Sequence, residues 1–320
     1  APAGPYYIED LYKAGGVQAV MKELASRDLL HLDLPTVTGQ NVGTNIADAV
    51  NRDPEVIRPI EQQGHDHRTF YLGDEFLIRI CSSLRYRYQV VKEYHYLPRF
   101  IPYLDLKIPS YRYLGVPSSQ FPYHFGILRF ISGESKSLLP LQDQNQVAET
   151  IKHFLKQFHT IPTEDGIAYG RHNFFRGGPI RIYVQEAMEA IKLLNFNQAA
   201  LRKILEDALN QPAHSPDVWV HGDLDVSNLL FEKDRCVAVI DFGGLAVGDP
   251  SCDYAFGYLC LDKKARDLFY SEVPESLIKK ARGWACWKAA ISLIQPALTT
   301  SLKAKYTQVL NRLLEDMDEI

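Results

Sequence analysis

The feature that most constrains this chain is a pair of short acidic motifs separated by two short apolar runs. Residues 221–223 read His-Gly-Asp and directly follow the apolar Val-Trp-Val of residues 218–220. An asparagine follows at position 228, and Asp-Phe-Gly occupies residues 241–243 after further apolar runs. Short apolar runs bounded by Gly, Asp and Asn are typical of strands that end in loops. The motifs therefore predict two loops at strand ends, each carrying an aspartate.

This spacing is typical of phosphoryl transfer from a nucleotide to a hydroxyl group. One carboxylate must accept or orient the acceptor hydroxyl, and we assign that role to Asp223. A second carboxylate and an amide oxygen must hold Mg²⁺ against the nucleotide phosphates, so Asp241 and Asn228 are the candidate metal ligands. His221 is expected to hold the loop by hydrogen bonds, and Gly222 to permit its turn. Either motif alone would indicate only a turn, but together they favour chemistry.

The segment from His221 to Asp253 resembles the aminoglycoside phosphotransferase family. It contains Asp-Phe-Gly-Gly and, at residues 248–253, Gly-Asp-Pro-Ser-Cys-Asp. Residues 63–74, and Val-Lys-Glu-Tyr at 91–94, extend the resemblance upstream, so that it covers roughly residues 58–320. The resemblance implies a two-lobed protein-kinase-like fold of class α+β, with a small β-rich N-lobe and a mainly helical C-lobe.

The hydrophobic pattern supports an N-lobe at residues 58–131. Residues 61–80 predict a hairpin, because Gly-Asp lies between two apolar and β-branched runs. Residues 87–97 predict a helix that Pro98 ends. Residues 125–131 predict a buried strand, so this block is a small sheet with one helix.

Residues 132–320 form the predicted C-lobe. Helices are expected within residues 180–210 and from about residue 263 to the end, and short strands within residues 218–241. A further helix is predicted by five apolar residues that share one face: Val147, Ile151, Phe154, Leu155 and Phe158.

The resemblance also implies a nucleotide site in the N-lobe. Arg79 stands where such kinases place a basic residue, usually lysine, and would contact the phosphates and pair with Glu93. Arginine can grip phosphate bidentately, so this departure need not remove function. The loop at Gly64 would cover the phosphates, although it lacks Gly-x-Gly-x-x-Gly. The base of ATP or GTP would bind the hinge backbone near Leu128 and Phe130.

The acceptor site is expected beside Asp223 in the C-lobe. Asp225 and Asp262 are candidate acceptor-binding carboxylates, which could attract a polycation such as an aminoglycoside or could simply be exposed loop acids. The aromatic residues could instead supply the apolar wall that a macrolide needs. Choline, homoserine and methylthioribose kinases share this arrangement of catalytic residues, so the site does not identify the acceptor. The nucleotide and the oligomeric state also stay open. Asp249 and Asp253 are expected to brace the catalytic loop.

Two other classes of protein compete with this interpretation. A non-catalytic nucleotide-binding regulatory module is conceivable, because Arg79 replaces lysine and the glycine-rich motif is missing. The presence of Asp223, Asn228 and Asp241 argues against it, since a binding-only module has little use for a base. A protein kinase is disfavoured because no Ala-Pro-Glu segment follows Asp-Phe-Gly.

The N-terminal residues belong to a different pattern. Residues 6–24, 29–33, 36–39 and 52–59 resemble a segment of the dihydroxy-acid dehydratase family. That family's iron–sulfur chemistry needs cysteine ligands, and the first cysteine of this chain is Cys81, beyond the match. We therefore expect residues 1–57 to be a borrowed fragment without dehydratase activity, packed as a helical extension on the N-lobe.

The composition of the chain limits the classes of partner that it is expected to bind. The net charge is −4, and the basic excess of a nucleic-acid binder is missing. No apolar stretch of about 18 residues predicts a membrane span, and no secretory signal is expected. Five cysteines without Cys-x-x-Cys are typical of free thiols in a reducing cytoplasm. The expected partner is a small molecule with a hydroxyl acceptor.

Overall fold

The computed structural model describes residues 8–26, 30–53, 56–61, 63–64, 66–118, 121–136 and 144–318. The chain divides into two compact units. Unit 1 comprises Ala1–Arg99 and Pro109–Ile131, and unit 2 comprises Phe100–Ile108 and Ser132–Ile320. Unit 1 contains a sheet and unit 2 is mainly helical, so the predicted α+β class is confirmed. The N-terminal extension falls within unit 1, and the boundary near residue 57 stays a prediction.

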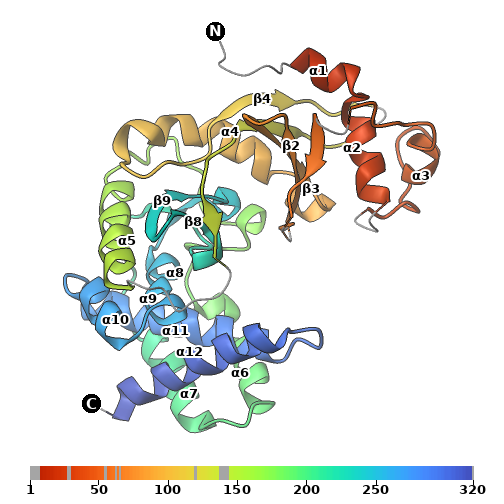
Figure 1. The fold of residues 1–320 in the computed structure, drawn as a ribbon. Helices are drawn as coiled ribbons and strands as arrows, with labels where there is room; N and C mark the ends of the chain where they lie inside the picture. Colours follow the sequence, from red (N-terminus) through yellow and green to blue (C-terminus); the bar gives the residue numbers. More distant parts are fainter. Residues whose placement is uncertain are drawn as a thin grey trace. The chain divides into compact units, whose positions relative to one another are not determined.

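Unit 1 is built on a five-stranded antiparallel sheet (Figure 1). The hairpin expected from the sequence is confirmed, with its turn at Gly73, whose φ of 58° suits glycine. The expected strand at residues 125–131 begins as predicted but ends two residues early. In spatial order the strands are β1 (Ile57–Pro59), β2 (His67–Leu72), β3 (Phe76–Cys81), β5 (Phe125–Arg129) and β4 (Tyr111–Gly115).

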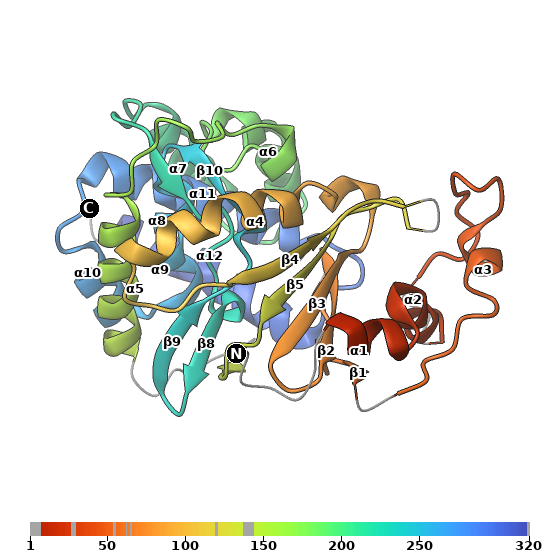
Figure 2. The same cartoon turned by 90° about the horizontal axis from the view of Figure 1, so that it is seen from above.

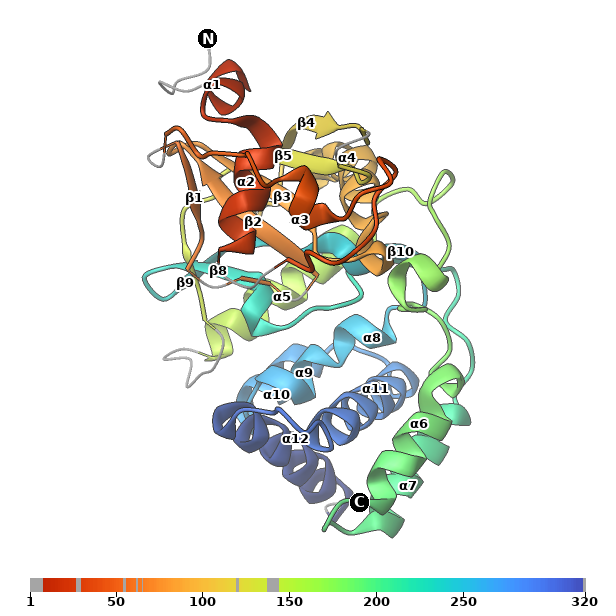
Figure 3. The same ribbon diagram turned by 90° about the vertical axis from the view of Figure 1, so that its right-hand side faces the viewer.

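The N-terminal extension shares a hydrophobic core with this sheet. Its helices are α1 (Ile8–Lys13), α2 (Gly16–Ala25) and α3 (Val42–Asn45), and α2 lies beside the sheet (Figures 1 and 3). Val20 and Leu24 of α2 are buried in one cluster with Phe70 and Ile78 of the strands. The expected packing of this segment on the N-lobe is confirmed by this shared cluster, in which the helix buries its apolar face.

The helix predicted for residues 87–97 does not end at Pro98. It is α4 (Gln89–Phe100), with Pro98 inside it, and a 3₁₀ turn, Ile101–Tyr103, follows. Phe100 is completely buried and its ring lies edge-on to Phe158 and Trp219, at centroid distances of 5.5 and 4.8 Å. Proline at position 98 removes one backbone hydrogen bond from the helix, but burial of Phe100 favours the extra residues.

Unit 2 is a helical assembly in which α11 packs against α6, α7, α8 and α12 (Figure 3). The predicted apolar face of α5 is confirmed as fully buried. Helices resume at Ser251, the start of α8, rather than at residue 263, and the Asp249 carboxylate accepts the Ser251 amide in the turn before α8. The helices are α5 (Gln144–Phe158), α6 (Arg181–Lys192), α7 (Gln198–Leu209), α8 (Ser251–Tyr254), α9 (Phe256–Cys260), α10 (Lys263–Tyr270), α11 (Glu275–Leu293) and α12 (Thr300–Asp318).

Two small sheets of unit 2 carry the motif loops (Figure 2). One pairs β7 (Val218–Val220) with β10 (Ala246–Gly248), and the other orders β6 (Glu134–Ser135), β8 (Leu229–Glu232) and β9 (Arg235–Val239). The strands predicted within residues 218–241 are therefore confirmed. Among the described residues, no helix has the length and apolarity to cross a membrane. All five cysteines are free thiols.

The shared core of unit 1 predicts that the extension contributes to folding stability. Leu24 is 1% exposed, so Leu24→Ala should lower the free energy of unfolding by about 2–5 kcal/mol, through lost burial and a cavity. Urea unfolding followed by circular dichroism measures this. Tyr12 is 82% exposed, and Tyr12→Ala should change stability by less than about 0.5 kcal/mol. Equal stability of the two variants would contradict the shared core.

Candidate active site

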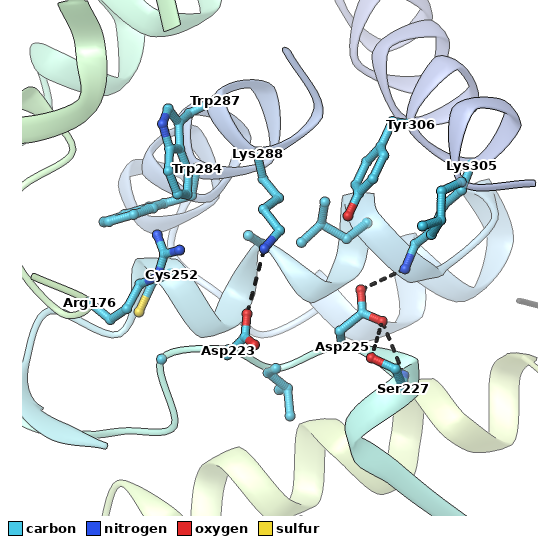
Figure 4. A pocket seen from close by; sticks show the side chains of 15 residues that line it. Arg176, Asp223, Asp225, Ser227, Cys252, Trp284, Trp287, Lys288, Lys305 and Tyr306 are labelled. Atoms are coloured by element: carbon cyan, nitrogen blue, oxygen red, sulfur yellow. Dashed lines mark hydrogen bonds and ion pairs between the residues drawn. The ribbon is translucent and has the colours of Figure 1, made fainter. Parts of the chain in front are cut away.

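The loop after β7 turns sharply at Gly222. Gly222 has a φ of 84°, and a Cβ built there would lie 2.4 Å from the carbonyl oxygen of Gly244. Only glycine meets both conditions, the left-handed backbone and the close approach of a second loop. The turn leaves the Asp223 side chain 55% exposed at the wall of a cavity (Figure 4).

A buried carboxylate holds this loop. One oxygen of Asp253, at the start of α8, accepts the His221 amide at 2.7 Å, and the other accepts the Gly222 amide at 2.8 Å. Asp253 is completely buried, and this burial raises its pKa despite the two donors. Asp249 instead accepts hydrogen bonds from Ser251 and Lys280. Asp253 thus makes the bracing contact expected of it, and Asp249 secures the neighbouring turn.

The His221 ring connects the two motif loops. Its Nε2 lies 3.0 Å from the Ile240 carbonyl oxygen, and its Nδ1 lies 3.3 Å from the Asp223 amide nitrogen. A proton on Nε2 therefore satisfies both contacts, with Nδ1 as acceptor. The ring is completely buried and packs 4.6 Å from the Phe242 ring. These contacts agree with a structural role for His221.

Asn228 and Asp241 lie on adjoining backbone segments. The Ile240 amide donates to the Asn228 carbonyl oxygen at 2.9 Å, and the Asn228 side-chain amide donates to the Asp223 carbonyl oxygen at 2.8 Å. Asp241 begins a 3₁₀ turn, Phe242–Gly244, in a left-handed conformation with φ 63°. The loop geometry therefore brings together the three residues that the sequence selects.

These donors fit Mg²⁺ better than a fully protein-coordinated metal. The Asn228 NH₂ group is used in the loop, so its amide oxygen and the Asp241 carboxylate are the atoms that would bind a metal ion. No group of three or more His, Cys, Asp or Glu side chains suited to a metal occurs in the described part of the chain. Two hard oxygen donors are the number Mg²⁺ uses when phosphates and water complete its coordination.

The expected nucleotide-binding residues lie in unit 1. Arg79 on β3 and Glu93 on α4 form the predicted pair, with Nη1 and Oε2 2.8 Å apart, and both side chains are buried. Tyr111 also donates to the Glu93 carboxylate, and His67 Nδ1 lies 3.0 Å from Arg79 Nη2. A buried charged pair with further hydrogen bonds fixes the guanidinium rigidly.

The other residues predicted to bind the nucleotide, Gly64, Leu128 and Phe130, also lie in unit 1, and their contacts do not indicate a nucleotide site by themselves. The Gly64 carbonyl oxygen accepts Arg68 at 2.6 Å, and the neighbouring residue 65 lies outside the described residues. Leu128 is buried in β5, whereas Phe130 is 38% exposed just beyond it. The Phe130 amide already donates to the Glu75 carbonyl oxygen at 2.8 Å. Nucleotide contacts by these residues stay predictions.

The two candidate acceptor carboxylates occupy different places. Asp225 lines the same cavity as Asp223 and pairs with Lys305 at 2.7 Å. Asp262 accepts the Ala265 amide as the N-cap of α10 and lines a separate hollow with residues of α12. The structure therefore brings Asp225, but not Asp262, to the cavity at Asp223.

The sequence interpretation suggested an aromatic wall but identified none of its residues, and it missed the basic residues of this cavity. The cavity has a volume of about 180 Å³. Lys288 and Lys305 come from α11 and α12, far along the chain, and no motif marks them. The only available signal was the spacing of Trp284, Trp287 and Lys288 on one helix, which also suits an ordinary core face.

Comparison with known proteins decides the family. The model of the phosphotransferase enzyme family, APH, matches residues 56–289, which is most of the chain. The chain belongs to the phosphotransferase enzyme family. The resemblance of residues 58–320 to aminoglycoside phosphotransferases is thereby confirmed, and a phosphotransferase function follows at the level of the family.

Solved structures of phosphotransferases share the fold. The GDP and kanamycin complex of APH(2")-IIia has a TM-score of 0.60 and 18% identity, covering 87% of this chain and 97% of that one. Macrolide 2'-phosphotransferase MphH from Brachybacterium faecium has a TM-score of 0.54 and 19% identity, covering 81% and 92%. The predicted two-lobed kinase-like fold is confirmed. Identities this low carry the fold alone.

The N-terminal segment matches a second family. The N-terminal model of dihydroxy-acid and 6-phosphogluconate dehydratases matches residues 1–45. Dihydroxy-acid dehydratase from Agathobacter rectalis is 69% identical over 61 residues, and that match covers 19% of this chain and 11% of the dehydratase. The chain thus spans about a ninth of that relative, and the predicted resemblance to a dehydratase fragment is confirmed.

The packing of Gly222 generates a prediction about the loop. Gly222→Ala should destabilise unit 2 by about 1–3 kcal/mol beyond the cost of a left-handed alanine, because the new methyl group meets backbone. Gly39→Ala is the matched control, since Gly39 has a φ of 79° and nothing within 4 Å of a built Cβ. Thermal unfolding of both variants measures the difference. Similar destabilisation would show that Gly244 does not restrict this turn.

Proposed function

We propose that this phosphotransferase moves the γ-phosphoryl group of ATP or GTP to a hydroxyl of a small molecule. The observation that carries the proposal is the exposed Asp223 carboxylate on a loop braced by Asp253. A base must reach its substrate, and the Asp223 side chain is exposed on a loop whose backbone is held in place. The same loop is bonded through Asn228 to the segment that carries Asp241.

The proposed step assigns one role to each residue. Asp223 orients the acceptor hydroxyl and takes its proton while the oxygen bonds to the γ-phosphorus. The bond from that phosphorus to the bridging oxygen breaks, and the nucleoside diphosphate leaves with those electrons. Asn228 and Asp241 would hold Mg²⁺, which neutralises charge on the phosphates when bound. Arg79, positioned by Glu93, would contact the α- and β-phosphates.

The proposal also includes the remaining contacts to the nucleotide and the cellular compartment of the enzyme. The loop at Gly64 would cover the phosphates, and the backbone near Leu128 and Phe130 would bind the base. Neither contact selects ATP over GTP. Five free thiols are consistent with action in a reducing cytoplasm.

The size of the cavity favours a metabolite over a large antibiotic as acceptor. Its volume of about 180 Å³ is below the range of about 300–1,000 Å³ typical of sites for drug-sized ligands. Aminoglycosides and macrolides would have to extend far beyond it. A metabolite kinase is therefore the favoured form of the proposal, and a kinase that modifies aminoglycosides or related antibiotics is the alternative.

The proposal predicts the effects of two substitutions. Asp223→Ala should lower kcat by about 10²–10⁴-fold through loss of the base, and Asp241→Ala should abolish measurable transfer through loss of the metal. Nucleotide consumption measures both, in a screen of aminoglycosides, macrolides and small amino or sugar alcohols with ATP and GTP. Asp217, an exposed aspartate before β7, supplies the control variant Asp217→Ala, which should keep full activity. Strong turnover by the Asp223 or Asp241 variant would refute these roles.

A further inference from the structure

The cavity beside Asp223 has a strongly aromatic wall. Trp284 and Trp287 of α11 form one side, and Tyr306 of α12 stands opposite (Figure 4). The rings of Trp284 and Trp287 are 5.6 Å apart and nearly perpendicular, and because each residue is only 3–4% exposed, a small part of each ring reaches the cavity. Such walls bury flat or apolar groups well, because aromatic side chains offer a large surface with little loss of conformational entropy.

The carboxylate of Asp225 has little attraction left for a cationic ligand. Its Oδ2 pairs with Lys305 at 2.7 Å, and its Oδ1 accepts both the amide and the hydroxyl of Ser227 at 3.1 Å (Figure 4). Burial would raise the pKa of Asp225, but the Lys305 ammonium outweighs it and holds the pKa below its usual value. Asp225 is thus ionised and already neutralised by its partner.

A cationic side chain also lies close to the Asp223 carboxylate. Lys288 Nζ lies 3.8 Å from Asp223 Oδ1, and Figure 4 shows the lysine reaching into the cavity towards it. The lysine side chain is 33% exposed, so it can reorient to a ligand. Each of the two carboxylates at this cavity therefore has its own ammonium group.

Arg176 adds a third positive charge to the cavity. Its guanidinium carbon lies 4.4 Å from the centre of the Trp287 ring and 5.4 Å from that of Trp284. Within the described ranges no carboxylate forms an ion pair with it. Its stem packs against the catalytic turn, since a Cβ built on Gly222 would lie 2.9 Å from the Arg176 Cβ. The contact with the two rings restricts the guanidinium, and Arg176, which lines the cavity and is only partly buried, can still donate N–H groups to a ligand there.

From this arrangement we infer that the acceptor is a small hydroxylated anion with a flat or apolar body, not a polycation. Arg176 binds the anionic group, Trp284 and Trp287 hold the body, and the hydroxyl lies at Asp223. Three cations against two carboxylates line the cavity, so a polycation would meet net repulsion. A carboxylate or phosphate instead gains charge-assisted, bidentate hydrogen bonds from arginine. The inference rests on the proposed function, because it takes Asp223 as the site of transfer.

Three matched compounds test this charge preference. They are 4-(hydroxymethyl)benzoate, its methyl ester and 4-(aminomethyl)benzyl alcohol, which share a ring and a hydroxymethyl group but are anionic, neutral and cationic. Calorimetric titration of the full chain should show the benzoate binding about tenfold or more tightly than the other two. Kanamycin, as a polycation, should bind no better than the cationic alcohol. Equal affinities, tighter binding of a cation, or no binding of the benzoate at millimolar concentration would overturn the inference.

Substitutions then locate the preference at Arg176. Arg176→Gln should reduce the benzoate-to-ester ratio to about threefold or less, while Arg176→Lys, which keeps the charge, should restore part of it. The matched control is Arg171→Gln, since Arg171 is exposed on the neighbouring 3₁₀ turn and does not line the cavity. A benzoate-to-ester ratio unchanged by Arg176→Gln would also overturn the assignment.

Nucleotide measurements separate this inference from the proposed function. If Mg-ATP or Mg-GTP binds and hydroxyl groups are phosphorylated without preference for the anion, the inference fails and the proposed function stands. If the benzoate binds selectively but no nucleotide binds and no acceptor is phosphorylated, the anion site stands and the proposed function fails.

Discussion

The site depends on one buried carboxylate. Asp253 accepts the amides of His221 and Gly222, and no water is needed to satisfy them. Leaving either amide without a partner in the interior would cost about 1–3 kcal/mol, so the loop has one favoured conformation. The His221 ring extends that order to Ile240 and hence to the Asp241 loop. Asp223 can therefore be exposed and still be held in place, which is the combination a base requires.

The dehydratase-like segment forms part of the hydrophobic core of the phosphotransferase domain in unit 1. The phosphotransferase match begins at residue 56, yet the described core of unit 1 begins at Leu11, in the dehydratase-like segment. Val20 and Leu24 cover Phe70 and Ile78 of the sheet. Hydrophobic burial is not directional, so an amphipathic helix of foreign origin can cover an apolar sheet face if its stripe is wide enough. The segment contributes to the hydrophobic core of unit 1.

Local features were predictable from the sequence, and long-range ones were not. Asp223, Asn228 and Asp241 lie within one short stretch, so their spacing alone indicated a shared site. The end of α4 was misjudged because burial of Phe100, a tertiary effect, outweighs the local preference of Pro98. The Lys305 partner of Asp225 lies 80 residues away, and only packing of α12 brings them together. For the same reason, the charged residues that line the cavity at Asp223 could be identified only from the structure.

Hydrogen exchange of the Asp253→Asn variant tests the central claim, that this carboxylate sets the geometry of the loop that carries Asp223. An amide side chain offers one acceptor oxygen and adds donors, so it cannot serve both backbone amides. Mass spectrometry of peptides spanning residues 218–225 should show faster exchange in the variant, with α11 and α12 unchanged. Unchanged exchange in that loop, or uniform loss of protection across unit 2, would contradict the account.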